Sequence, residues 1–155
     1  MAEKNLSVLI DTAVRKEEEA IAFYTDLMAQ VEDVSVRDTL SFIASEERKH
    51  RAFLLGYREG RYGPADLKVS EPVYYRIAEY QEEPKAGKAM TPAEAFLLAS
   101  HRELRAHRFY SELSELHTEG ELRQMILKMA GEELRHKEKM EYLYVNAAFP
   151  QTSGG

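Results

Sequence analysis

The chain repeats part of itself at an offset of 86 residues, and this repeat limits its possible folds more than any other feature of the sequence. Shifting the sequence by that amount aligns Phe23-Tyr24 with Phe109-Tyr110. The same shift aligns two glutamates and one histidine of the first copy with identical residues of the second: Glu17 with Glu103, Glu47 with Glu133, and His50 with His136. Two copies of one helical hairpin are the simplest explanation of such a repeat.

Glycine and proline indicate where the two copies begin and end. Residues 6–59 contain a single glycine and no proline, whereas six glycines and prolines fall within residues 60–87. Thr91-Pro92-Ala93-Glu94 then supplies an N-cap, a first-turn proline and a capping-box glutamate. The sequence therefore predicts one domain over residues 1–148, made of a hairpin at about 5–60, a crossover at about 61–91 and a second hairpin at about 92–148, with a tail at 149–155. Within the crossover, Val73–Tyr80 is predicted to form a short helix.

Each of the four long predicted helices carries an apolar seam that a glutamate interrupts. Apolar residues recur at alternating spacings of four and three, the pattern of helices packed in a bundle. The interruptions are Glu17, Glu47, Glu103 and Glu133, and His50 and His136 each follow a seam glutamate by three residues. Residues equidistant from a turn lie side by side in an antiparallel hairpin. The turns expected near residues 32 and 118 therefore place all six side chains at one height inside the bundle.

Buried carboxylates in this number imply a bound metal. An uncompensated buried charge costs several kcal/mol, and no lysine or arginine lies on the seams to offset the four glutamates. Two divalent cations would balance four carboxylates, and Glu-x-x-His places both side chains on one helix face. Four glutamates and two histidines on four helices are the ligands of di-iron and di-manganese carboxylate bundles. We expect two metal ions, with iron as the leading candidate; manganese or zinc would also fit these donor atoms.

Composition excludes several other kinds of function. The chain has no cysteine, which excludes disulfides, thiol catalysis and thiolate-bound zinc or iron. Its net charge is −6 and no basic block stands out, so nucleic acid is not an expected partner. The longest apolar run is Ala95–Ala99, too short to cross a membrane, and no leader sequence opens the chain. We therefore expect a cytoplasmic protein without a membrane partner.

Four segments of the sequence resemble the rubrerythrin branch of the ferritin-like superfamily. They are Glu17–Tyr24 (EEEAIAFY), Glu46–His50 (EERKH), Glu103–Tyr110 (ELRAHRFY) and Glu132–His136 (EELRH). The resemblance implies an all-α, ferritin-like four-helix bundle made of two repeated helical hairpins with a long crossover. It also implies roles for individual residues: Glu17 and Glu103 as terminal ligands, Glu47 and Glu133 as bridging ligands, His50 and His136 as caps on one metal each, and Tyr24 and Tyr110 as hydrogen-bond donors to carboxylates across the bundle.

By the same resemblance, the chain is expected to be a non-haem di-iron oxidoreductase that reduces hydrogen peroxide or dioxygen. It would act as a homodimer and take electrons from an external donor such as a rubredoxin-like protein. Two features depart from typical rubrerythrins: a cysteine-ligated rubredoxin domain is missing, and Ala106 occupies the position of an additional glutamate. Two other functions therefore stay open, a ferroxidase or iron-handling protein and a metal-stabilised interaction protein without turnover.

Two structural questions also stay open at this level. The crossover would allow the hairpins either to close one bundle or to exchange between two chains. His107 lies four residues beyond Glu103, close to the face that carries it. It is therefore either a structural histidine, or an extra ligand or proton shuttle.

Overall fold

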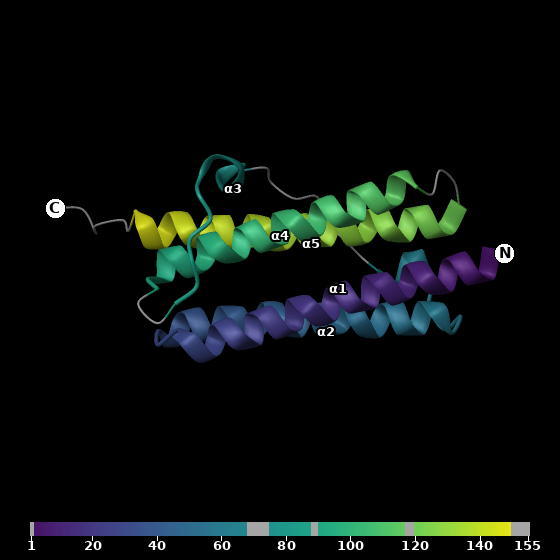
Figure 1. Cartoon of the computed structure of the whole chain (residues 1–155), viewed down its shortest axis with the longest axis horizontal. Coiled ribbons are helices and arrows are strands. Elements are labelled where there is room, and N and C mark those ends of the chain that lie inside the picture. Colours follow the sequence, from purple (N-terminus) through teal and green to yellow (C-terminus); the bar gives the residue numbers. More distant parts are fainter. Residues whose placement is uncertain (1, 68–74, 88–89, 117–119, 150–155) are drawn as a thin grey trace.

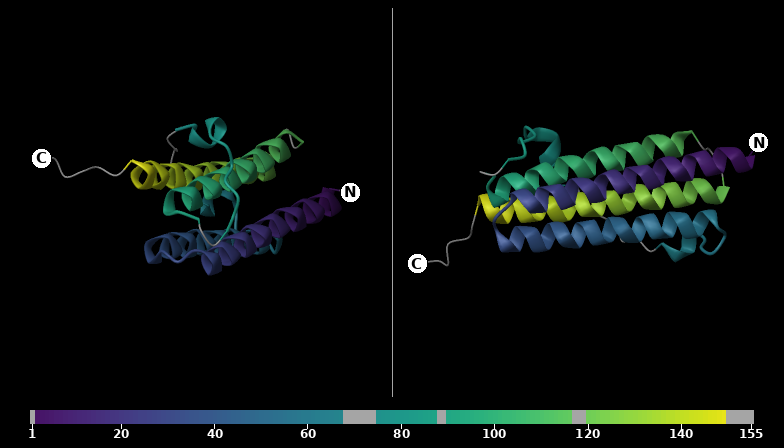
Figure 2. Two further views of the ribbon diagram at one scale, coloured as in Figure 1. Left: turned by 60° about the vertical axis from the view of Figure 1, so that its left-hand side comes forward. Right: turned by 60° about the horizontal axis from the view of Figure 1, so that its bottom comes forward.

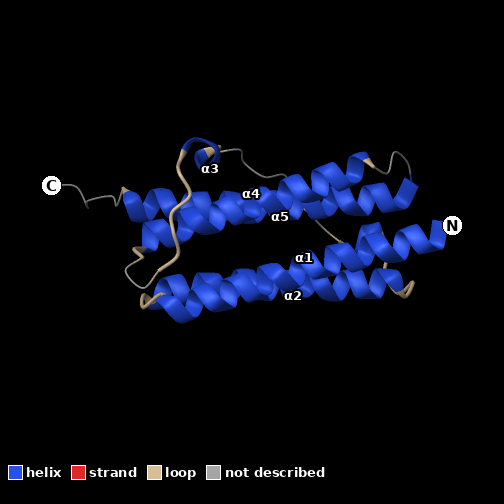
Figure 3. Ribbon diagram, in the orientation of Figure 1, coloured by secondary structure: helices blue, strands red, loops and turns tan. Residues whose placement is uncertain are grey.

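The computed structural model describes residues 2–67, 75–87, 90–116 and 120–149, omitting the side chains of residues 2–6 and Pro64. These residues form helices and connecting loops without a strand (Figure 3). The elements in chain order are α1 (Ala2–Gln30), α2 (Val34–Arg58), the 3-10 helix η1 (Pro64–Asp66), α3 (Ile77–Tyr80), α4 (Pro92–Glu115) and α5 (Gly120–Ala148). The predicted all-α, ferritin-like bundle is confirmed.

The four long helices form two antiparallel hairpins, α1 with α2 and α4 with α5 (Figure 1). Asp33 starts α2 by accepting a 3.0 Å hydrogen bond from the backbone N–H of Val36. The predicted capping box starts α4, because the Glu94 N–H donates to Thr91 Oγ1 and the Thr91 N–H donates to Glu94 Oε1, both at 3.2 Å. The turn expected near residue 118 lies outside the described residues.

The crossover joins hairpins that stand side by side along their length (Figures 1 and 2). Helix α4 begins at the end of the molecule where α1 ends, so the chain between α2 and α4 spans the length of the bundle (Figure 1). The predicted helix at Val73–Tyr80 is too long, because the helix begins only at Ile77. Arg76 has a left-handed backbone with φ of 58°, which interrupts a right-handed helix at that residue. Residues 73–74 and the tail from 150 lie outside the described residues.

A buried ion network attaches α3 to α5. Glu141 Oε2 accepts hydrogen bonds from the backbone N–H groups of Ile77, at 2.6 Å, and Ala78, at 2.9 Å. The Lys137 ammonium lies 2.8 Å from Glu141 Oε1 and 2.9 Å from Glu79 Oε1. Lys137 is only 2% exposed, so both partners of the Lys137–Glu141 pair are out of water. The crossover is therefore held to the second hairpin by charge as well as by packing.

The predicted seams line the interior of the bundle. One apolar cluster includes Leu27, Leu40 and Phe96, and the other includes Ile10, Leu54 and Ile126. Along each long helix, the seam glutamate lies between the residues of these two clusters. Among the described residues, no helix combines the length and the apolar character that crossing a bilayer requires.

Candidate metal centre

All six seam residues meet in the middle of the bundle, and every one of them is buried. Helix α1 supplies one glutamate, α4 supplies another, and α2 and α5 each supply a glutamate and a histidine. Their oxygen and nitrogen atoms form two overlapping groups, in each of which the contributing atoms all lie within 4.8 Å of one another. The groups are Glu17, Glu47, His50 and Glu133, and Glu47, Glu103, Glu133 and His136. Glu47 and Glu133 belong to both.

Each histidine faces a carboxylate of the opposite hairpin. His136 Nδ1 lies 2.9 Å from Glu47 Oε1, and His50 Nδ1 lies 3.3 Å from Glu133 Oε1. The two imidazole rings stack almost in parallel, with centroids 5.5 Å apart and an interplanar angle of 9°. The 86-residue repeat therefore appears in space as two matching halves of one cluster.

Two tyrosines complete this symmetry by bonding across the hairpins. The hydroxyl of Tyr110 on α4 donates a 2.6 Å hydrogen bond to Glu17 Oε1 on α1. The hydroxyl of Tyr24 on α1 donates to Glu103 Oε1 on α4. Burial and the neighbouring carboxylates raise the pKa of both tyrosines well above the usual value of 10, so each hydroxyl keeps the proton that it donates.

The four carboxylates divide into two pairs with opposite pKa shifts. Burial, reinforced by the charges of neighbouring glutamates, raises the pKa of Glu47 and Glu133 well above the usual 4.5. Burial also acts on Glu17 and Glu103, but hydrogen bonding with their neighbours outweighs it and lowers both pKa values, that of Glu103 to about 2. Without metal, the two carboxyls shared by both groups therefore bind protons more tightly than Glu17 and Glu103 do.

The acidic neighbours of the two histidines raise the pKa values of both imidazoles. Burial alone would lower the pKa of His50, but the adjacent carboxylates of Glu133 and Glu17 raise it well above 6.5. The pKa of His136 is also raised, because the nearby carboxylate of Glu103, 3.7 Å from its Nδ1, exceeds the effect of burial. The cluster thus offsets its negative charge with protons that a cation would displace.

The cluster fits divalent cations because its polar atoms are left without partners. Among the described residues, six buried side-chain nitrogen or oxygen atoms have no hydrogen-bond partner, and five belong to this cluster. The five are Glu17 Oε2, His50 Nδ1, Glu103 Oε2, Glu133 Oε1 and Glu133 Oε2. Carboxylate oxygen and imidazole nitrogen are ligands for iron, manganese and zinc. Two such ions would satisfy these atoms and balance four carboxylates.

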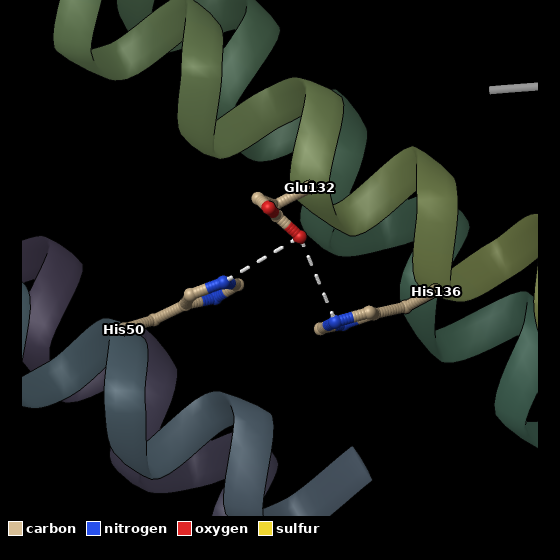
Figure 4. A group of neighbouring side chains, drawn as sticks. All are labelled: His50, Glu132 and His136. Carbon is tan, nitrogen blue, oxygen red and sulfur yellow. Dashed lines mark ion pairs between the residues drawn. The ribbon is translucent and has the colours of Figure 1, made fainter. Parts of the chain in front are cut away.

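Another buried glutamate lies next to the two histidines, Glu132, and the sequence did not predict it to lie at the site. Its Oε2 atom lies 3.9 Å from Nε2 of His50 and 3.9 Å from Nε2 of His136 (Figure 4). The repeat aligns Glu132 with Glu46, which instead pairs with Lys49 at 3.1 Å. The pair Glu-Glu occurs in both copies, so the repeat does not distinguish them. Glu132 precedes His136 by four residues, a spacing that places both on one helix face, but Glu46 precedes His50 by the same spacing, so this signal does not single out Glu132 either.

His107, four residues beyond Glu103 on α4, belongs to neither of the two groups. Its Nδ1 atom is 2.8 Å from the backbone carbonyl oxygen of Ala130, and a carbonyl only accepts, so Nδ1–H is the donor. This bond ties α4 to α5 and favours the structural interpretation of His107.

A pocket of about 120 Å³ opens onto the carboxylates between α1 and α4. Its lining comprises Lys16, Glu17, Glu19, Ala20, Glu47, Arg102, Glu103, Arg105, Ala106, Phe109, Tyr110 and Glu133. Two repeat-related cations of this lining lie over aromatic rings, Lys16 over Phe109 at 5.2 Å and Arg102 over Phe23 at 5.3 Å. Because one water needs only about 10–15 Å³ by this measure, the pocket has room for a small molecule.

Comparison with known proteins agrees with the geometry. The rubrerythrin family model matches residues 1–58, which make up the first hairpin. No curated protein and no solved structure matched the chain significantly. The matched segment contains three of the clustered residues, Glu17, Glu47 and His50, and the repeat supplies their counterparts in the second hairpin. The first hairpin thus matches the rubrerythrin family, and the chain forms a ferritin-like helical bundle with a buried glutamate–histidine cluster compatible with a di-iron site.

Proposed function

We propose that the chain is a non-haem di-iron oxidoreductase of the rubrerythrin type, reducing hydrogen peroxide or dioxygen. The observation that carries the proposal is the pair of overlapping four-residue groups, which share Glu47 and Glu133. A mononuclear site would need only one such group. The family-model match over the first hairpin supports the same function.

The six cluster residues can be assigned to two metal ions. Glu17 and His50 belong to one group only, and Glu103 and His136 belong to the other only, so these would each serve a single metal. Glu47 and Glu133 would bridge the two metals. Tyr24 and Tyr110 would fix the orientation of the single-metal glutamates through their hydrogen bonds. Iron is the proposed metal, and manganese or zinc would be held by the same atoms.

When bound, two ferrous ions would supply the two electrons that, with two protons, convert one hydrogen peroxide to two waters. The chain's own residues control access to this chemistry. Ala20 and Ala106 have short side chains that leave the pocket above the carboxylates open, and Phe109 gives it an apolar wall. The tyrosine hydroxyls keep Glu17 and Glu103 in place while a small oxidant enters.

Electrons must then return to the site from outside the chain. The 155 residues contain no cysteine with which to build an iron–sulfur or rubredoxin-type relay. We therefore propose a separate electron donor, such as a rubredoxin-like protein, and a homodimeric assembly. Light scattering of the purified protein tests the assembly.

Mixing the anaerobic ferrous-loaded protein separately with hydrogen peroxide and with dioxygen tests the function. We expect rapid oxidation by peroxide, with about one peroxide consumed per two irons, followed by arrest until reductant and carrier are added. A Glu133→Gln variant is the control, because it removes a carboxylate from both groups. Continuous turnover with NADH alone would contradict the requirement for a donor, and a ferrous protein inert to both oxidants would favour the interaction protein.

The ferroxidase function is favoured by one specific observation. Ala106 lines the pocket at the position where typical rubrerythrins have an additional glutamate, so the peroxidase mechanism of that family lacks one of its carboxylates here. Rapid oxidation by dioxygen combined with slow oxidation by peroxide would assign the chain to this second function.

A further inference from the structure

Glu132 occupies a side of the two histidines that the six-residue cluster does not use. The Nδ1 atoms of His50 and His136 face the seam carboxylates, whereas their Nε2 atoms both face Glu132 Oε2 (Figure 4). That single oxygen is 3.9 Å from each Nε2. Glu132 is 8% exposed, so water does not compete freely for its carboxylate.

The position of Glu132 is not a consequence of the repeat. Its counterpart Glu46 lies in the equivalent place on α2 but forms an i,i+3 ion pair with Lys49, whose side chain is 69% exposed. Lys49 aligns with Arg135, which is exposed and has no comparable contact with Glu132 among the described ion pairs. In one copy of the hairpin this carboxylate therefore points inward, where it lies 3.9 Å from a histidine of each copy.

The chemistry of imidazole explains what an inward carboxylate would do there. A neutral histidine binds metal through one unprotonated nitrogen and carries its proton on the other. An acceptor at Nε2 favours the form in which Nδ1 is free to bind, and it also fixes the plane of the ring. A separation of 3.9 Å is bridged by one water or by a small rotation of the carboxylate.

We propose that Glu132 is a positioning residue for both histidines, accepting hydrogen bonds from their Nε2–H groups directly or through one water. The proposal rests on the proposed function, because it assumes that Nδ1 of each histidine binds a metal. A metal bound at Nε2 itself is the competing explanation, since His50, Glu132 and His136 also form a close group. With Nδ1 already binding, that arrangement would require each imidazole to lose both of its protons.

Zinc titration against a competing chelator tests the proposal without redox activity. The variants are Glu132→Met, which removes the acceptor, and Glu132→Gln, which keeps a neutral one. Glu46→Met is the matched control at the repeat-related position. We expect Glu132→Met to weaken zinc binding by about 10–100-fold and Glu132→Gln to weaken it less. Glu46→Met should bind zinc as the wild type does.

Nitrogen-15 spectra of the zinc-loaded proteins supply a readout that a purely structural role would not change. We expect slowly exchanging, low-field Nε2–H signals from both histidines in the wild type and in Glu46→Met. Glu132→Met should lose that protection. If Glu132→Met fails to fold, Glu132→Gln decides, and wild-type affinity with unchanged Nε2–H signals in that variant overturns the proposal.

The remaining outcomes separate the two proposals. Fewer than two zinc ions bound by the wild type would refute the dinuclear site. Two zinc ions held equally by the wild type and Glu132→Met, with unchanged spectra, would leave the site intact and overturn the role of Glu132. A third zinc ion lost only in the Glu132 variants would make Glu132 a metal ligand, which also overturns the positioning role.

Discussion

The hydroxyl of Tyr110 donates a 2.6 Å hydrogen bond to Glu17, and this bond connects α4 of the second hairpin to α1 of the first. Tyr24 makes the repeat-related bond to Glu103 in the opposite direction. Both glutamates have lowered pKa values, so each tyrosine bonds to a charged carboxylate in a buried place. The contact between the hairpins therefore depends on polar bonds as well as on apolar packing.

Replacing one tyrosine should weaken the association of the hairpins. Tyr110→Phe leaves the ring in place but removes the donor to Glu17, and a hydrogen bond to a charged group contributes about 1.5–3 kcal/mol. We expect the free energy of unfolding of the metal-free protein to fall by about that amount in urea titrations. Tyr142→Phe, at a position 55% exposed on α5, should change little. Equal stability of both variants would contradict a stabilising role for the bond.

Glu133→Gln should affect the metal-free and metal-loaded proteins in opposite ways. Because burial and the neighbouring carboxylates raise the pKa of Glu133 well above 4.5, they favour its neutral form in the metal-free protein, and glutamine imitates that form. We expect the metal-free variant to melt at or above the wild-type temperature, and added metal to give little further stabilisation. Glu112→Gln, on the exposed face of α4, is the control. A variant that still binds two metals tightly would remove Glu133 from the bridging position.

The pH dependence of stability follows from the directions of the pKa shifts. Four groups, Glu47, Glu133, His50 and His136, have raised pKa values in the folded state. Their contribution is complete below the usual values of 4.5 and 6.5 and is lost as the pH rises through the raised pKa values. Glu17 and Glu103 act oppositely, contributing above 4.5 and losing their contribution as the pH falls through their lowered pKa values. The metal-free protein should therefore lose stability as the pH rises through neutrality.

The stabilisation that bound metal provides should increase as the pH rises, because a metal displaces the protons that the cluster holds. We expect the difference in melting temperature between loaded and metal-free protein to grow from pH 6 to pH 8. Calorimetric titrations in buffers of different ionisation enthalpy should show proton release on binding. Identical melting of the two forms at neutral pH would refute a buried site that metal stabilises.

Filling the pocket should slow the reaction of the metal-loaded protein with oxidants without removing the metals. Ala106→Leu adds apolar bulk to the pocket wall and leaves all six cluster residues unchanged. We expect the loaded variant to keep two metals while the second-order rate with peroxide falls by at least about tenfold, equivalent to about 1.4 kcal/mol in the barrier. Ala52→Leu makes the same change at an exposed position on α2. An unchanged rate would mean that the oxidant enters by another route.

Lys137 should stabilise the attachment of α3, in the crossover, to α5. Lys137→Met leaves Glu141 buried without its cation, a loss that costs about 3–5 kcal/mol for buried pairs. Chemical denaturation should show this decrease, whereas Lys49→Met on the surface should not. Adding Glu141→Gln to Lys137→Met should restore part of the stability, because the amide oxygen still accepts from the N–H groups of α3. A double variant no more stable than the single one would contradict this explanation.

The sequence was sufficient for the fold and for the convergence of six residues because both follow from helical periodicity. Glu17 and Glu103 stand out because their neighbours on the helix seams are apolar. The repeat supports both positions, because each glutamate has its counterpart in the other copy. The capping box at Thr91 was equally predictable, since its geometry depends only on residues close together in the chain.

The features that the sequence did not predict depend on contacts between distant residues. Glu132 and Lys137 lie in a charged run of α5 that reads as a solvated surface, and only tertiary packing turns them inward. The shortened helix at Ile77 has a related cause, because its first N–H groups bond to Glu141, which is 63 and 64 residues away in the chain. Periodicity along one helix carries no information about such partners.

The sharing of Glu47 and Glu133 between the two halves also bears on how such a chain could arise. Each four-residue group takes three residues from one hairpin and one from the other, so a single hairpin holds neither group. Two identical hairpins related by a twofold axis would supply both, which makes a self-associating half-length ancestor sufficient for the chemistry. Fusion into one chain frees the two copies to differ, and the inward Glu132 opposite Glu46, which pairs with an exposed lysine, is a difference that strict twofold symmetry forbids.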